Sequence, residues 1–221
     1  MDFEIYLAIA AAYTLVLLLI VYHLVKTSWR RYPLLLLLVV FALIYDNAII
    51  ALGESIGEGE LLQSLSTLRY WMHALFTPCL VLVGWDIARR TGMKWLNSTA
   101  AKITAWLITI GLIIYQIIAV TIKEVSDLVP AREYGVLRYM PSGEPGSMAM
   151  VIIVGTLLFI GGLIVLFKLR WPWMAIGTAI LFVGRAIPIP FESSAITNIY
   201  ELILIVSLWA AIKYEDRKGI I

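Results

Sequence analysis

The chain has 221 residues, of which 62% are hydrophobic and only 14% are charged, and its formal net charge is +2. Soluble domains carry about 25% charged and 45–50% apolar residues, so this composition excludes an ordinary soluble fold and predicts an all-α membrane protein. The small net charge gives no reason to expect a nucleic-acid partner. At roughly 20 residues per spanning helix, the length allows seven short-looped helices in one domain.

Cysteine and histidine are scarce in this chain. Cys79 is its only cysteine, and His23 and His73 are its only histidines. A single cysteine excludes an intramolecular disulfide and a cysteine metal cage. Two histidines are too few for the His-rich metal sites of many membrane hydrolases and desaturases. We therefore expect neither a metal nor another cofactor.

Seven apolar stretches follow one another, each ended by charges, glycine or proline. They predict membrane-spanning helices over 4–25, 33–53, 67–88, 100–122, 148–168, 172–190 and 195–213. The sixth is interrupted by glycines and by Pro188 and Pro190, and the seventh follows at once, which predicts a tight helical hairpin. Because the chain begins with Asp2 and Glu4 rather than with the basic region of a signal peptide, we expect the first stretch to be a retained helix.

Basic residues are divided unevenly between the predicted loops. Loops one, three and five and the C-terminal tail hold most of them: Lys26, Arg30, Arg31, Arg89, Arg90, Lys94, Lys102, Lys168, Arg170, Lys213, Arg217 and Lys218. The other side offers Lys123, Arg132 and Arg138, all in loop four. The positive-inside rule then predicts an outside N-terminus, a cytoplasmic C-terminus and an odd number of spans. We expect a multi-pass protein of the cell membrane.

Loop four, over 123–147, is the only long connection. Its turn-forming residues are Pro130, Pro141, Gly143, Pro145 and Gly146. Two interpretations are open: a short hairpin or cap over the outer face, or a plain solvated linker. No internal repeat is evident, so the inverted-repeat architecture of many secondary transporters is not indicated.

Polar residues within the predicted spans gather in the outer half of the membrane. Ionisable residues there are costly and usually face the protein interior or a water-filled cavity. The deepest are Asp46, His73 and Glu201, which are our candidate catalytic residues. The candidate substrate-binding residues are Asn47, Glu54, Arg69, Tyr70, Arg185 and Asn198. We predict a polar site enclosed by the second, third, sixth and seventh helices.

These residue types allow several chemistries. A carboxylic acid kept protonated by apolar surroundings can donate a proton to an alkene or epoxide. The arginines can hold a phosphate or diphosphate head group, and His73 can act as a general base. A structural interpretation is also open, in which Arg69 pairs with Glu54 or Glu192 at the interface and His73 only packs. The chain contains no HExxH, Gly-rich phosphate loop or DDxxD motif.

Three functional interpretations follow. In the first, a small membrane enzyme acts on a lipid or isoprenoid, and Asp46, His73 and Glu201 converge on a pocket that opens outward or sideways. In the second, the same residues bind or transport an ion, a proton or a small ligand, which requires a water path to the cytoplasm. In the third, salt bridges such as Asp46–Arg185 only lock the helices. We favour the enzyme, because the polar groups gather on one side of the membrane, the chain is small and no internal repeat is evident.

One predicted helix resembles the third helix of microbial rhodopsins. The stretch over 68–82 reads LRYWMHALFTPCLVL, and its Arg69-Tyr70 and Thr77-Pro78 pairs have the family's spacing. In that family the arginine belongs to the outer proton path, and the Thr-Pro turn lies beside retinal. The resemblance implies a rhodopsin-like bundle of seven helices.

The resemblance does not extend to the retinal chemistry. The family's counterion aspartate, three residues after the arginine, is replaced here by Met72. The retinal lysine in the middle of the seventh helix is absent, and the first lysine in that helix is Lys213. We therefore expect a rhodopsin-like scaffold used without retinal for another purpose.

Overall fold

The apolar stretches form long helices, because in lipid every backbone N–H and C=O must find its partner inside the chain. The computed structural model describes residues 2–27, 31–143, 147–186 and 193–219. Within these ranges six helical segments are long and apolar enough to cross a membrane: Asp2–Lys26, Tyr32–Ile56, Glu60–Arg90, Thr99–Ser126, Ala149–Leu169 and Ile196–Arg217. The chain is thus an all-α, multi-pass membrane protein.

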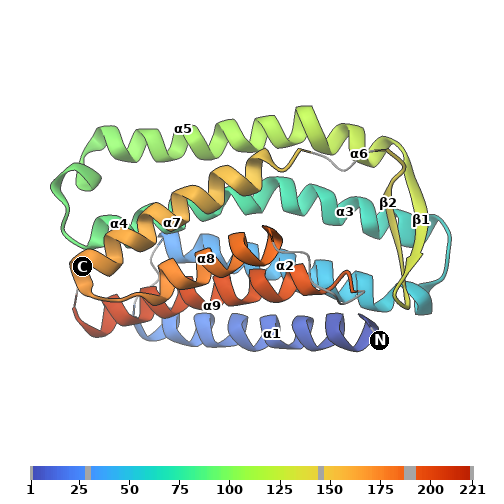
Figure 1. The fold of residues 1–221 in the computed structure, drawn as a ribbon, viewed down its shortest axis with the longest axis horizontal. Helices are drawn as coiled ribbons and strands as arrows, with labels where there is room; N and C mark the ends of the chain where they lie inside the picture. The colour runs from blue at the N-terminus through green and yellow to red at the C-terminus, as the bar shows by residue number, and fades with distance from the viewer. Residues whose placement is uncertain (1, 28–30, 144–146, 187–192, 220–221) are drawn as a thin grey trace.

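The elements run along the chain in the order shown in Figure 1. They are α1 (Asp2–Thr27), α2 (Arg31–Ile56), α3 (Glu60–Phe76), η1 (Thr77–Cys79), α4 (Leu80–Arg90), η2 (Lys94–Asn97), α5 (Thr99–Tyr115), η3 (Gln116–Thr121), α6 (Ile122–Ser126), β1 (Leu128–Glu133), β2 (Val136–Pro141), α7 (Ala149–Leu169), α8 (Trp173–Ala186) and α9 (Ile196–Arg217). Each of the seven predicted helices corresponds to one of these helical segments, within a few residues at most ends. The third begins earlier, at Glu60, because Leu62 and Ser66 on its first turns are buried.

Two predicted helices contain irregular turns. The third is divided at η1, a 3₁₀ turn around the buried Pro78, because proline lacks an N–H for the helical ladder. The fourth continues from α5 through η3, a π-helical turn from Gln116 to Thr121, into α6. A π turn inserts an extra residue into the helix and changes which side chains face inward. Both turns lie beside the polar site described below.

The sixth predicted helix, 172–190, is described only as far as Ala186, so Pro188 and Pro190 lie outside the described residues. Its described part, α8, has 14 residues, which is about 21 Å at 1.5 Å per residue and less than the roughly 30 Å of a bilayer core. The expected packing of this helix against the next is confirmed. A Cβ on Gly177 of α8 would lie 2.4 Å from the Ser207 hydroxyl of α9.

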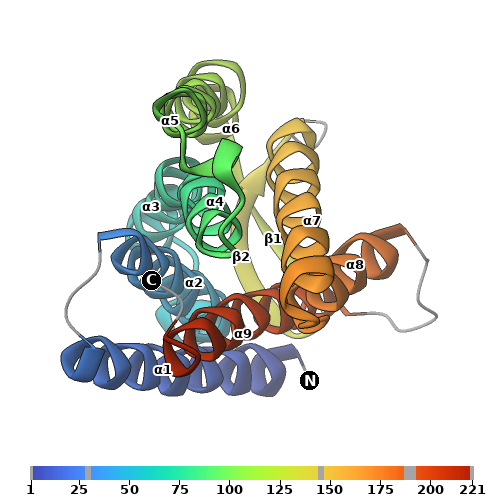
Figure 2. The ribbon, with the colours of Figure 1, turned by 90° about the vertical axis from the view of Figure 1, so that its left-hand side faces the viewer.

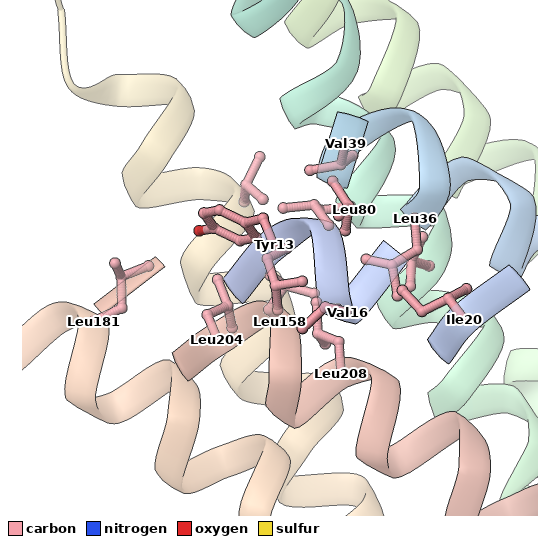
Figure 3. Close-up of a cluster of buried hydrophobic side chains, with 14 of the residues drawn as sticks. Tyr13, Val16, Ile20, Leu36, Val39, Leu80, Leu158, Leu181, Leu204 and Leu208 are labelled. Atoms are coloured by element: carbon pink, nitrogen blue, oxygen red, sulfur yellow. The ribbon is translucent and has the colours of Figure 1, made fainter. Parts of the chain in front are cut away.

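The core of the bundle is apolar and lies between α1, α2, α4, α7, α8 and α9. Tyr13, Leu80, Leu158 and Leu204, from four of these helices, are almost fully buried there and point toward one another in Figure 3. Figure 2, which looks along the bundle, shows α5 on its periphery. The outward side chains of α5, such as Leu107, are exposed, which suits contact with lipid tails.

A β-hairpin covers one end of the bundle, so the hairpin interpretation of loop four is confirmed. Strands β1 and β2 pair antiparallel, with Leu128 opposite Pro141. Leu137 of β2 packs with Ile49 of α2 and Leu62 of α3 in a second buried cluster. The N-terminus lies at this hairpin end, where the Asp2 N–H donates to the Tyr134 carbonyl (3.2 Å). The C-terminal end of α9 lies at the opposite end (Figure 1).

Gly53 allows the hairpin to approach α2 closely. A Cβ at this position would lie 1.7 Å from the carbonyl oxygen of Leu137, a distance that no packing adjustment of side chains can relieve. We expect Gly53→Ala to lower the free energy of unfolding by about 1–3 kcal/mol, as overpacking does. The measurement is thermal unfolding in detergent. Gly111→Ala is the matched control, since a Cβ there meets nothing within 4 Å. Equal melting temperatures for the two variants would contradict the described packing.

Candidate functional site

Six of the predicted site residues line one cavity of about 180 Å³. They are Asp46, Arg69, His73, Arg185, Asn198 and Glu201. The described residues that line this cavity come from α2, α3, η1, α8 and α9, which belong to the second, third, sixth and seventh predicted helices. The three candidate catalytic residues therefore converge, as their shared depth in the sequence predicted.

Two ion pairs hold the charged groups of this cavity. Arg69 Nε donates to Asp46 Oδ1 at 2.7 Å, which joins α3 to α2. Arg185 Nη2 donates to Glu201 Oε1 at 2.6 Å, which joins α8 to α9. The expected alternatives, Asp46 with Arg185 and Arg69 with Glu54, are wrong. Each arginine instead binds the carboxylate of the helix packed beside its own. Glu192, the other partner considered for Arg69, lies outside the described residues.

His73 is oriented by the residue one turn later. Its Nδ1 lies 3.1 Å from the hydroxyl of Thr77, the first residue of the 3₁₀ turn. Its Nε2 has no hydrogen-bond partner among the described residues. The residue lines the 180 Å³ cavity and also two neighbouring cavities. His73 therefore lines all three cavities. Its Nδ1 is hydrogen-bonded to Thr77, and its Nε2 is available for another hydrogen bond.

A second cavity of about 240 Å³ shares Asp46, Arg69 and His73 with the first. It extends toward the π turn η3, α6 and α7, and its further lining residues are Tyr70, Gln116, Val120, Glu124, Ser147, Met148, Met150 and Val151. The participation of the fourth and fifth predicted helices was not expected. A sequence signal did exist, since Gln116 is the one strongly polar residue in the middle of an apolar helix, but the π turn that brings it inward has no recognisable pattern.

A third, apolar cavity of about 50 Å³ adjoins the polar site. It shares three polar residues, His73, Thr77 and Glu201, and two apolar ones, Val39 and Leu43, with the first cavity. The rest of its lining is apolar: Leu80, Val151, Val154, Gly155, Leu158, Leu181, Leu204 and Ile205. The polar and apolar cavities therefore meet at these five shared residues.

Two predicted site residues lie outside the cavities. Asn47 is fully buried; its Nδ2 donates to the Leu43 carbonyl (2.7 Å), and its Oδ1 accepts from Asn198 Nδ2 (2.9 Å). This pair joins α2 to α9 and is structural. Glu54 is exposed at the hairpin end, where its carboxylate lies 3.6 Å from Arg132 Nε.

The opposite end of the bundle contains a buried cluster of charges, which was not expected from the sequence. Arg90 of α4 pairs with Glu215 of α9 (Nη1–Oε2, 2.9 Å) and with Asp216. Asp216 also accepts a hydrogen bond from His23 Nε2 of α1 (2.9 Å). The sequence places Arg90 in loop three, after the predicted end of the third helix, but α4 and α9 continue far enough to bury it.

The described residues contain no group of three or more His, Cys, Asp or Glu side chains placed to hold a metal ion. No protein-family model matches the chain, and no curated protein or solved structure is significantly similar to it. The resemblance of the third helix to microbial rhodopsins therefore stays a prediction.

The ion pairs of Arg90 and of Arg185 differ in burial, and this predicts that they contribute differently to the free energy of unfolding. The Arg90 side chain is 2% exposed, whereas that of Arg185 is 23% exposed. Removing one partner of a buried pair costs about 3–5 kcal/mol, since it leaves an uncompensated charge. We expect Arg90→Met to lower the free energy of unfolding by about this amount, and Arg185→Met by much less.

Reversible unfolding in detergent measures both variants. Adding Glu215→Gln to Arg90→Met is the internal check, because it removes the buried negative charge that Arg90 compensates and is expected to restore part of the stability. If Arg185→Met destabilised the protein as strongly as Arg90→Met, burial would not determine how much each ion pair contributes to stability.

Proposed function

We propose that this protein is a small enzyme of the cell membrane that uses acid–base chemistry on a lipid or isoprenoid substrate. The observation that carries the proposal is the junction of a polar cavity with an apolar one at His73, Thr77 and Glu201. A molecule with a polar group and a hydrocarbon tail suits such a junction, because each part meets a surface of its own polarity. The bilayer supplies molecules of this kind.

In the proposed chemistry, His73 transfers the proton. Its Nδ1 is held by Thr77, which leaves Nε2 to accept or donate a proton at the substrate. Asp46 and Glu201 are kept in fixed positions by Arg69 and Arg185. Their carboxylates stabilise positive charge that develops on the imidazole or on the substrate.

We further propose seven spans, with the N-terminus outside and the C-terminus in the cytoplasm. The uneven distribution of Lys and Arg supports this orientation. The placement of the two chain ends at opposite ends of the bundle supports an odd number of crossings. In this arrangement α8 provides the crossing that the six longer helical segments do not supply.

A binding or transport function for an ion, a proton or a small ligand is the second candidate. The buried charges around Arg90 and Asp216 favour it, because they give the opposite end a polar group that a carrier needs. The apolar core argues against it. Tyr13, Leu80 and Leu158 from three helices are buried against one another in this core (Figure 3), and a water path along the bundle would have to pass such side chains.

Cysteine labelling tests the topology. In a Cys79→Ser background, we expect Glu58→Cys, which is exposed at the hairpin end, to react with a membrane-impermeant maleimide on intact cells. We expect Lys218→Cys, exposed after α9, to react only after permeabilisation. Labelling of both on intact cells would mean an even number of crossings between them, which corresponds to six spans. The reverse pattern would invert the orientation.

Lipid analysis of cells with and without the gene tests the enzymatic function. We expect the wild-type gene to change one lipid or isoprenoid species, and His73→Gln to reduce this change by about 100-fold or more, as loss of a general acid or base does. Glu201→Gln is expected to reduce it as well, because it removes a carboxylate that stabilises developing positive charge. Glu54→Gln is the matched control, because Glu54 is exposed outside the cavities. An unchanged lipid profile together with proton or solute flux in liposomes would support transport instead. Full activity of the site variants with lowered melting temperatures would leave only a structural role.

A further inference from the structure

Among the described residues around the site, carboxylates outnumber arginines, and this affects the kind of head group that the site accepts. The described residues that line the 180 and 240 Å³ cavities include two arginines, Arg69 and Arg185, and three carboxylates, Asp46, Glu124 and Glu201. Both arginines are paired with a carboxylate at 2.7 Å or less. A phosphate or diphosphate is held by positive charge that is not already neutralised, so the expectation of such a head group loses its basis.

Two buried polar atoms of the 240 Å³ cavity have no hydrogen-bond partner among the described residues: Gln116 Oε1 and Arg69 Nη1. Gln116 is 5% exposed, and the Arg69 side chain is 10% exposed. A buried polar atom without a partner costs about 1–3 kcal/mol, so few are kept without a reason. Here one atom is an acceptor and the other is a donor, and both residues line the same cavity.

The π turn explains how Gln116 comes to line this cavity. Gln116 begins η3, which follows the regular helix α5. The wider π turn changes the direction of the side chains at this point. The cavity is also lined by apolar side chains, Val120, Met148, Met150 and Val151, and by further polar ones, Asp46, Tyr70, His73, Glu124 and Ser147. Within this mixed lining, Gln116 contributes an acceptor and Arg69 a donor that have no partner among the described residues.

A hydroxyl group satisfies both atoms, because it donates one hydrogen bond and accepts others. An ammonium group has no lone pair for Arg69, and a fully ionised phosphate has no proton for Gln116 and would meet the carboxylates of Asp46 and Glu124. We propose that the 240 Å³ cavity binds the hydroxyl of an uncharged lipid or isoprenoid alcohol, which donates to Gln116 Oε1 and accepts from Arg69 Nη1. This inference rests on the proposed function, since it names the substrate class of the same site.

This inference is tested by measuring the equilibrium binding of lipid probes to the full chain in phosphatidylcholine nanodiscs, with empty nanodiscs as the background. The probes are geranylgeraniol, its methyl ether and its diphosphate, with dioleoylglycerol and dioleoylphosphatidic acid as a second matched pair. For the wild-type chain, we expect an alcohol of at least one pair to bind, and its phosphorylated partner to bind at least ten times more weakly. If geranylgeraniol binds, its methyl ether, which keeps the oxygen but lacks the proton, is expected to bind about ten times more weakly, a difference of about 1.4 kcal/mol.

The variant Gln116→Leu keeps the volume but removes the acceptor. We expect it to bind the alcohol about as weakly as the wild type binds the ether, and to distinguish the two no longer. Gln63→Leu is the matched control, because Gln63 is the other glutamine of the chain and is exposed on α3. The comparison of alcohol and ether on the wild-type chain needs no variant, so it stands even if Gln116→Leu unfolds.

Two results would overturn the inference and leave the proposed function intact. One is binding of a phosphorylated probe as tight as that of its alcohol. The other is equal binding of geranylgeraniol and its ether by the wild-type chain. If none of the five probes bound above the empty nanodiscs, the inference and the lipid substrate of the proposed function would both fail.

Discussion

Pairing of charges within an apolar bundle is the constraint on which the rest of this structure depends. A carboxylate inside a membrane protein is costly unless a partner compensates it. Asp46 and Glu201 each obtain an arginine from the neighbouring helix. These contacts join α2 to α3 and α8 to α9, so the same interactions that make the charges tolerable also fix the helices that enclose the site.

Two irregular turns change the position of side chains beside the cavities. The 3₁₀ turn at Thr77–Cys79 follows from a proline inside a long helix, and it leaves Thr77 in contact with His73. The π turn at Gln116–Thr121 brings a glutamine to the wall of a cavity. In our proposal these turns create the places where a lipid or isoprenoid meets polar groups.

The two ends of the bundle are stabilised by different interactions. At the hairpin end, β1 and β2 pack on α2 and α3 through Leu137 and Leu62. At the opposite end, Arg90 and Asp216 join α4 to α9, and His23 adds α1. The hairpin and the charge cluster thus each join segments that are distant in sequence: β1 and β2 to α2 and α3, and α4 to α9 and α1. The apolar core contains Tyr13 and its neighbours (Figure 3). The polar site is therefore framed by rigid contacts on both sides.

The sequence by itself determined the helices and the depth of the site. Apolar runs of about 20 residues have few structural solutions in lipid, and charges within them mark functional positions. This predicted that Asp46, His73 and Glu201 converge. The tertiary structure decided which groups pair, that Asn47 locks two helices and that Gln116 lines the cavity. Partners such as Arg90 and Asp216 are 126 positions apart, and only packing, which depends on all the helices at once, brings them together.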